Sequence, residues 1–494
     1  MAYCSVRACK VADWLRQFMM SPPSTIPLAN YSKWPDAPAE EEPMVLPVVE
    51  AVKWTRQISS LAPEIMCMIF HEGRNSASGP WNTERRLPFE VLVSHVSPLW
   101  RSIALADPFL WTTIRVAPAT PFSRIHAYLA HSRAFPLSIT LQTHPKAHGS
   151  WDATACMALL APHVRRWRSL DVSARTRADL SALLATLRPL AAPRLEDLNV
   201  HCARDDPAAD PRVHLSDRTP IFGGGAPTLA RVHLVGIGLD SLSVPLSAVT
   251  KVSMMNDGQP ETPDSTLISW DEFHESLSGG RSLLSMRLMG QLFRHAQTNA
   301  AVLELPSLAH LELPLCANGA SARLLSRLSA PLLRSLHLCT SDHDEADDEF
   351  RTLFDSHYMK PWSQDFLSLT NLTIDCADIH EQNTFAQMSC AFPAVDTIEF
   401  GGTISQSTTL FLDLVAKAGG RGTDLNSCFP NLHTIAMRQW MNIEVAPLRH
   451  MLEARIAAQR PIATLLLSPT TIAQIEPAEL LWLRDHVTIE ELKV

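Results

Sequence analysis

The chain has 494 residues, of which 46% are hydrophobic and 19% charged, and its formal net charge is -9. This length exceeds what one compact core usually serves, and the composition is typical of globular proteins and not of disordered ones. The negative net charge argues against a nucleic-acid-binding protein, whose binding face would be basic.

No stretch of about eighteen apolar residues is present, so the sequence predicts no membrane span and no membrane partner. Charged residues from Arg7 to Arg16 interrupt any apolar region that could serve as a signal peptide. We therefore expect a cytoplasmic or nuclear protein.

The ten cysteines show no C-x-x-C pair, which favours reduced thiols over disulfides or structural zinc. His201 with Cys202, and Cys376, His380 and Cys390, lack the paired spacing of metal ligands. The sequence predicts no metal and no cofactor.

Residues 1–57 are rich in proline, with seven prolines between positions 22 and 47. Proline removes a backbone donor and fixes φ, so this density opposes regular structure. We expect a flexible Pro-rich leader, with a docking peptide for a partner as the alternative.

Residues 58–116 predict three short helices. Ser60 can cap the first helix, and Pro63 and Glu64 suit its first turn. A second helical pattern includes Leu92, Val93 and Val96, and Asp107-Pro108 ends the region. Pro98 lies inside that second pattern, which predicts a kink or break near residues 94–97.

This segment resembles the F-box-like domains of the large fungal families. The similarity rests on LAPE at 61–64, on SHVS at 94–97 leading to Trp100-Arg101, and on PFLW at 108–111. The resemblance implies docking on a Skp-type adaptor and, through it, on a cullin scaffold. The residues that would contact the adaptor are Leu61, Pro63, Ile65, Ile69, Phe70, Val96 and Trp100. Alternatively, these apolar residues form the core of a helical subdomain.

Residues 117–494 repeat a unit of three apolar residues spaced as in L-x-x-L-x-L. Eleven such units occur, roughly 20 to 37 residues apart: Trp167/Leu170/Val172, Leu195/Leu198/Val200, Leu229/Val232/Leu234, Val249/Val252/Met254, Leu283/Met286/Leu288, Leu308/Leu311/Leu313, Leu333/Leu336/Leu338, Leu369/Leu372/Ile374, Val395/Ile398/Phe400, Leu432/Ile435/Met437 and Ile462/Leu465/Leu467. One short strand cannot bury its apolar face alone, whereas stacked parallel strands share a continuous core.

Helical patterns fall between several units, at 153–164, 177–190, 320–328, 408–417 and 448–459. Together with the prolines that often precede a unit, they resemble the irregular leucine-rich repeats that follow F-boxes. The expected fold class is α/β, in which a small three-helix F-box-like module precedes an irregular leucine-rich-repeat solenoid with a curved parallel sheet and outer helices.

In such a solenoid, the residues that flank the central apolar position of each strand face the concave side. The candidate target-binding residues are Arg231, His233, Arg287, Glu312, His337 and Glu399. Their mixture of charges and donors suits recognition of a protein by complementarity. Ordinary solvent exposure is the alternative for each of them.

No catalytic motif is evident. Gly223-Gly224-Gly225 lacks the Lys-Ser/Thr of a phosphate loop, and neither G-x-S-x-G nor H-E-x-x-H occurs. The loops 203–212 and 340–349 are rich in acidic residues and predict solvated insertions; the second could instead recognise a basic partner.

The expected function is target recognition in a Skp-cullin-F-box ubiquitin ligase, without catalysis by this chain. The alternatives are a repeat scaffold that acts outside a ligase and an enzyme whose site is built from dispersed residues.

Overall fold

The computed structural model describes residues 61–76, 87–118, 120–143, 153–202, 220–237, 242, 244–256, 269–290, 301–315, 320–340, 353, 366–375, 382–403, 406–417, 428–439 and 445–492. The predicted leader lies outside these residues, as do the predicted loop 203–212 and, apart from Thr340, the loop 340–349. The chain divides into two compact units. The described residues up to 115 together with 120–138 form the first unit, and residues 116–119 and those from 139 onward form the second.

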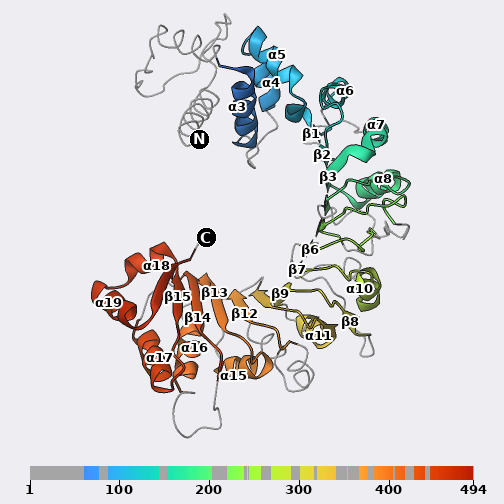
Figure 1. The fold of residues 1–494 in the computed structure, drawn as a ribbon. Helices are drawn as coiled ribbons and strands as arrows, with labels where there is room; N and C mark the ends of the chain where they lie inside the picture. Colours follow the sequence, from blue (N-terminus) through green and yellow to red (C-terminus); the bar gives the residue numbers. More distant parts are fainter. Residues whose placement is uncertain are drawn as a thin grey trace, which may run out of the picture. The chain divides into compact units, whose positions relative to one another are not determined.

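The first unit begins with three helices, α3 (Pro63–Ser76), α4 (Phe89–Ser94) and α5 (Pro98–Ala106) (Figure 1). They are followed by the 3-10 helix η2 (Pro108–Trp111), the strand β1 (Thr113–Val116) and α6 (Phe122–His131). The predicted break near residues 94–97 is confirmed, because α4 ends at Ser94 and α5 begins at Pro98. Ser97 caps α5 by accepting a hydrogen bond from the Trp100 amide at 3.2 Å. Pro98 is therefore tolerated, since a first helical residue has no partner for its amide.

Aromatic side chains hold the first unit together. Phe70 is fully buried in α3, and its ring centroid lies 5.1 Å from that of Trp100 in α5. The Trp111 indole donates to the Ala104 carbonyl at 2.8 Å and packs edge-on against Tyr128 of α6. Burying large rings with their polar edges satisfied gives this small unit a specific core.

The second unit alternates strands with helices. Its strands are β2 (Leu137–Gln142), β3 (Trp167–Ala174), β4 (Asp197–Cys202), β5 (Arg231–Val235), β6 (Lys251–Met255), β7 (Ser285–Met289), β8 (Leu303–Glu304), β9 (His310–Leu315), β10 (Leu328–Ser329), β11 (Ser335–Thr340), β12 (Asn371–Asp375), β13 (Thr397–Thr403), β14 (Thr434–Gln439), β15 (Thr464–Leu467) and β16 (Thr488–Glu491). Its helices are α7 (Ala153–Leu160), η3 (Ala161–Arg166), α8 (Arg177–Leu187), α10 (Trp270–Leu277), α11 (Ala320–Ser326), α15 (Gln382–Ala391), α16 (Gln406–Lys417), α17 (Val445–Ala457), α18 (Pro469–Gln474) and α19 (Pro477–His486).

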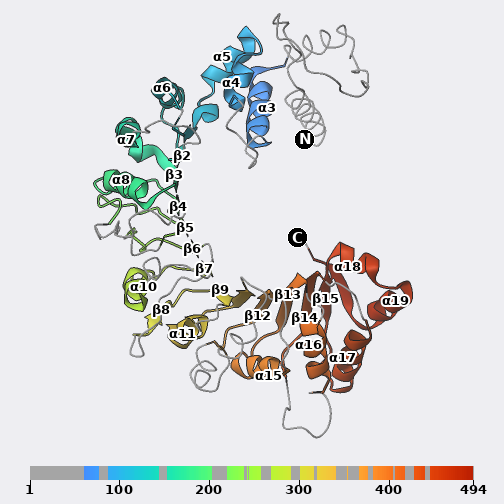
Figure 2. The same cartoon turned by 180° about the vertical axis from the view of Figure 1, so that it is seen from behind.

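Fourteen strands of the described chain form one sheet in chain order, while β8 and β10 form a separate parallel pair. The pairing is parallel from β3 to β16. Helices α10, α11, α15, α16 and α17 lie along one face of this sheet (Figures 1 and 2). The α/β fold class with a large parallel sheet is thus present, and each of the eleven predicted units contains one of its strands.

The register explains how the units share one core. The central apolar residue of each unit pairs with that of the next, as in Leu311 with Leu336 and Leu336 with Leu372. These residues are 0–2% exposed, so they form a buried row across the strands. The third apolar residue of each unit forms a second buried row in the same way, for example Leu313 with Leu338.

A tight turn precedes many of these strands and explains the prolines. The amide of the first apolar residue donates to the carbonyl three residues earlier, as from Leu195 to Ala192 and from Leu308 to Leu305. Pro193 and Pro306 occupy the second position of these turns, where a φ near -65° is required. The prolines at these positions therefore initiate the turns that lead into their strands.

Candidate functional site

The face of the sheet opposite the helices carries a row of polar side chains between the two buried apolar rows. Strand register places them side by side. In strand order from β3 to β13 they are Asp171, Asn199, His233, Ser253, Arg287, Glu312, His337, Thr373 and Glu399. Arg287 is exposed and the others are half-buried, so solvent reaches this row.

A chain of ionisable groups crosses four strands here, and three of them belong to this row. Arg287 Nε lies 3.1 Å from Glu312 Oε1, and His337 Nδ1 lies 3.5 Å from the same oxygen. On the other side, His337 Nε2 lies 3.9 Å from Asp375 Oδ2. Ion pairs that solvent still reaches each contribute only about 0–1 kcal/mol to stability. Their fixed geometry is better suited to complementing charges on a bound partner.

Two further ion pairs lie on the sheet. Arg231 contacts Asp197 of the neighbouring strand, with Nη2 donating to Oδ2 at 2.6 Å, and Arg438 contacts Glu399. The structure therefore brings Arg287, Glu312 and His337 together and assigns Arg231 and Glu399 to separate pairs. Sequence reasoning did not select Asp375 or Arg438, because both lie beyond the two residues that flank the central apolar position.

His233 lies among charged neighbours on this face. Burial lowers its pKa from the usual 6.5, and Arg287 lowers it further, whereas Asp171 opposes the shift. Burial also raises the pKa of Asp171, against the effect of His201 and His233. The charged forms of both side chains are thus disfavoured in the folded chain.

An apolar strip borders the polar row at the ends of β5, β6 and β7. Val235, Met255 and Met289 are paired by register and are half-buried. Cys339 lies 3.4 Å from the Met289 sulfur, and burial raises its thiol pKa to about 12. This cysteine is therefore a packing residue and not a thiolate nucleophile.

Within the described residues, no group of three or more histidine, cysteine, aspartate or glutamate side chains could hold a metal ion. Every helix in the described part of the chain is too short or too polar to cross a bilayer.

The residues predicted to contact an adaptor divide into two groups. Pro63, Ile65 and Val96 are exposed and Leu61 is half-buried, so they are accessible in the first unit. Ile69, Phe70 and Trp100 are 7%, 0% and 6% exposed, which corrects their assignment as contact residues. Their side chains fill the core of the first unit instead.

Other apolar residues of the first unit are accessible although the sequence did not predict it. On α3, Met68 is 64% exposed and follows Ile65 (37% exposed) by three positions, so the two share one helix face. Leu99 at the start of α5 is 41% exposed. Because residues 65–70 of α3 are all apolar, hydrophobic periodicity alone could not separate its inner face from its outer face there.

No family model and no curated protein matches this chain. Among solved structures, a crystal structure of a Bacteroides fragilis protein from a structural genomics programme is similar over 74% of this chain and 76% of its own, with 12% identity and a TM-score of 0.30.

Proposed function

We propose that this chain is the target-recognition subunit of a Skp-cullin-F-box ubiquitin ligase. In this proposal, α3, α4 and α5 form an F-box-like module that binds a Skp-type adaptor, and the second unit is an irregular leucine-rich-repeat solenoid that binds a target protein. The observation that carries it is the combination of an exposed apolar face on α3 with a parallel sheet whose open face presents polar side chains. A subunit that links an adaptor to a target protein requires these two parts, an F-box-like module and a protein-binding array.

The chain would supply no catalytic group. Holding a target beside the charged ubiquitin carrier raises the effective concentration of its lysines, which accelerates transfer without acid or base catalysis. The polar row from His233 to His337 and the adjoining strip of Val235, Met255 and Met289 would provide the target contacts. Methionine side chains adapt to varied apolar partners, which suits the edge of a recognition surface.

The adaptor contact is tested with the double variant Ile65→Asp, Met68→Asp. Both side chains are exposed on α3, so the chain should still fold, whereas a carboxylate buried at an interface without a partner is costly. We expect co-purification with a Skp-type adaptor and cullin from the wild type, and at least about a tenfold loss in the variant.

The matched control is Phe122→Asp, which places a charge at a 47% exposed aromatic residue of α6 in the same unit. The control should capture the adaptor as the wild type does. If the folded wild type captures neither adaptor nor cullin, the ligase role is overturned.

A repeat scaffold acting outside a ligase is the second candidate. The helix break between α4 and α5 favours it, because Val96, a predicted adaptor contact, lies outside both helices and not on a continuous helix face. Adaptor capture that depends on Ile65 and Met68 but proceeds without cullin would support this scaffold.

A further inference from the structure

Three neighbouring strands of the second unit carry cations but no carboxylates on their open face. Arg231 of β5, Lys251 of β6 and Arg287 of β7 lie on this face, and we call these three residues the cationic patch. A histidine, two serines, a valine and two methionines complete the open face of these strands. The carboxylates Asp197 and Glu312 lie on the strands that border the patch, β4 and β9.

Lys251 is the cation of this patch whose charge is not balanced. Arg231 forms an ion pair with Asp197, and Arg287 forms one with Glu312, so both bordering carboxylates are already engaged. Lys251 is exposed and has no ion-pair partner among the residues that the structure describes. The strand register places it directly beside Arg231, and like charges on neighbouring strands repel each other. An anionic partner above β6 would offset this repulsion.

The environment of His233 agrees with a positive potential at the patch. Burial lowers the pKa of this histidine, and the charges of Arg287 and His201 lower it further, against the attraction of Asp171. A further positive charge is therefore disfavoured next to Arg287, as expected at a surface that attracts anions.

An apolar strip borders the patch on one side. Val235 and Met255 lie four residues beyond Arg231 and Lys251 on the same strands, which corresponds to about 13 Å along a parallel strand. Met289 continues the strip on β7, and all three of its side chains are half-buried. A partner that covers both the patch and the strip therefore needs carboxylates that adjoin apolar side chains.

We propose that the cationic patch and the apolar strip bind an acidic segment of the target protein in which carboxylates adjoin apolar side chains. This inference rests on the proposed function, in which the second unit binds a target. A carboxylate would pair with Lys251, and the methionines would adapt to the apolar side chains. A basic segment would meet three cations, and an uncharged segment would bury Lys251 without a counter-charge.

Three synthetic peptides of equal length test the chemistry of the partner. The first joins a block of glutamates to a block of leucines, the second replaces the glutamates by lysines, and the third replaces the leucines by serines. Each peptide carries fluorescein, and fluorescence anisotropy measures its binding to the full chain. We expect saturable binding of the glutamate–leucine peptide and at least about tenfold weaker binding of the other two. Absence of saturable binding by the first peptide, or equal binding of either of the others, overturns the proposal.

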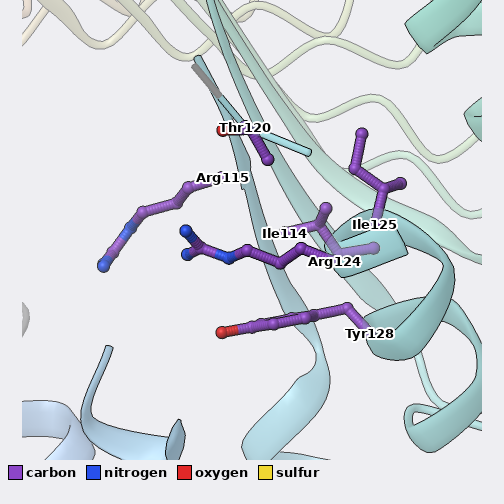
Figure 3. A pocket seen from close by; sticks show the side chains of 6 residues that line it. All are labelled: Ile114, Arg115, Thr120, Arg124, Ile125 and Tyr128. Atoms are coloured by element: carbon purple, nitrogen blue, oxygen red, sulfur yellow. The ribbon is translucent and has the colours of Figure 1, made fainter. Parts of the chain in front are cut away.

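The decisive variant is Lys251→Gln, Arg287→Gln, for which we expect at least about tenfold weaker binding of the glutamate–leucine peptide. Lys251→Gln alone breaks no ion pair and should weaken binding to a smaller extent. The matched control, Arg115→Gln, Arg484→Gln, removes the same charge at two exposed arginines outside the patch. Figure 3 shows the first of them, Arg115, extending from β1. Equal losses in the control and the decisive variant would indicate non-specific attraction and would contradict the proposal.

Failure of this proposal is distinguishable from failure of the ligase proposal. The variant Ile65→Asp, Met68→Asp changes only the first unit, so it should bind the glutamate–leucine peptide as the wild type does. The decisive variant leaves α3 unchanged and should still capture the adaptor. Sedimentation of the free chain tests a second copy as the occupant: a dimer that the decisive variant abolishes would overturn the proposal.

Discussion

Single glycines determine how the chain leaves two of the strands. Gly236 follows β5 and Gly290 follows β7, and both have a φ of +72°, which side chains rarely adopt. A Cβ at Gly236 would collide with the Cys202 carbonyl, and one at Gly290 with the Asn256 carbonyl. Glycine is therefore required where the chain passes close to the end of the preceding strand.

Gly290→Ala should lower the free energy of unfolding by about 1–3 kcal/mol, because it adds both backbone strain and a steric clash. Urea denaturation of the second unit, followed by circular dichroism, measures the change. Gly279→Ala is the control, since nothing lies within 4 Å of its Cβ position. An equal effect at both glycines would refute this explanation.

The pKa shift of His233 predicts a pH dependence. Burial, Arg287 and His201 lower its pKa from 6.5, and Asp171 acts in the opposite direction. The unfolded chain therefore binds this proton more tightly than the folded chain does. The contribution of His233 to the free energy of unfolding is complete above pH 6.5, and it falls as the pH drops through the lower pKa of the folded chain.

His233→Gln should flatten the dependence of unfolding free energy on pH below 6.5, the usual value for this side chain. Urea denaturation at a series of pH values tests this. His95→Gln, at an exposed residue of the first unit, should retain the wild-type slope. A slope unchanged in His233→Gln would contradict the assignment.

At the scale of elements, aromatic packing attaches helices to the sheet. Phe411 of α16 lies between Phe400 of β13 and Phe385 of α15, with ring centroids 5.2 Å and 5.4 Å away. Phe429 lies 5.9 Å away, and all four rings are 0–2% exposed. One side chain thus joins a strand, two helices and the turn before β14.

Phe411→Ala should cost about 3–5 kcal/mol of stability, because the cavity cannot be filled by its rigid neighbours. Thermal and urea denaturation of the second unit measure this loss. Phe122→Ala removes the same ring at an exposed position of α6 and should cost far less. Similar losses for the two variants would mean that Phe411 does not link these elements.

At the scale of the whole molecule, the two units have different kinds of surface. The first unit presents apolar side chains on α3, whereas the open face of the sheet presents charged groups largely paired with one another. The prediction at this scale is that the complete chain captures an adaptor through Ile65 and Met68. Its measurement tests whether the first unit links the second unit to a ligase.

Much of the fold follows from the sequence. The apolar spacing placed eleven strands correctly, because parallel stacking requires the same two residues of each strand to face inward. The helix break before Pro98 was also predictable, since proline lacks the amide that a helix interior requires. Both features depend on neighbouring residues alone.

Tertiary structure alone decided which polar and apolar residues are accessible and which lie together. Arg287, Glu312, His337 and Asp375 are separated by 25 to 38 residues along the chain, and only the strand register aligns them. Likewise, the packing of α3 against α5 decided that Phe70 is buried while Met68 remains exposed. Local sequence specifies which residues can form a strand or helix face, whereas the partner of each face depends on contacts between distant segments.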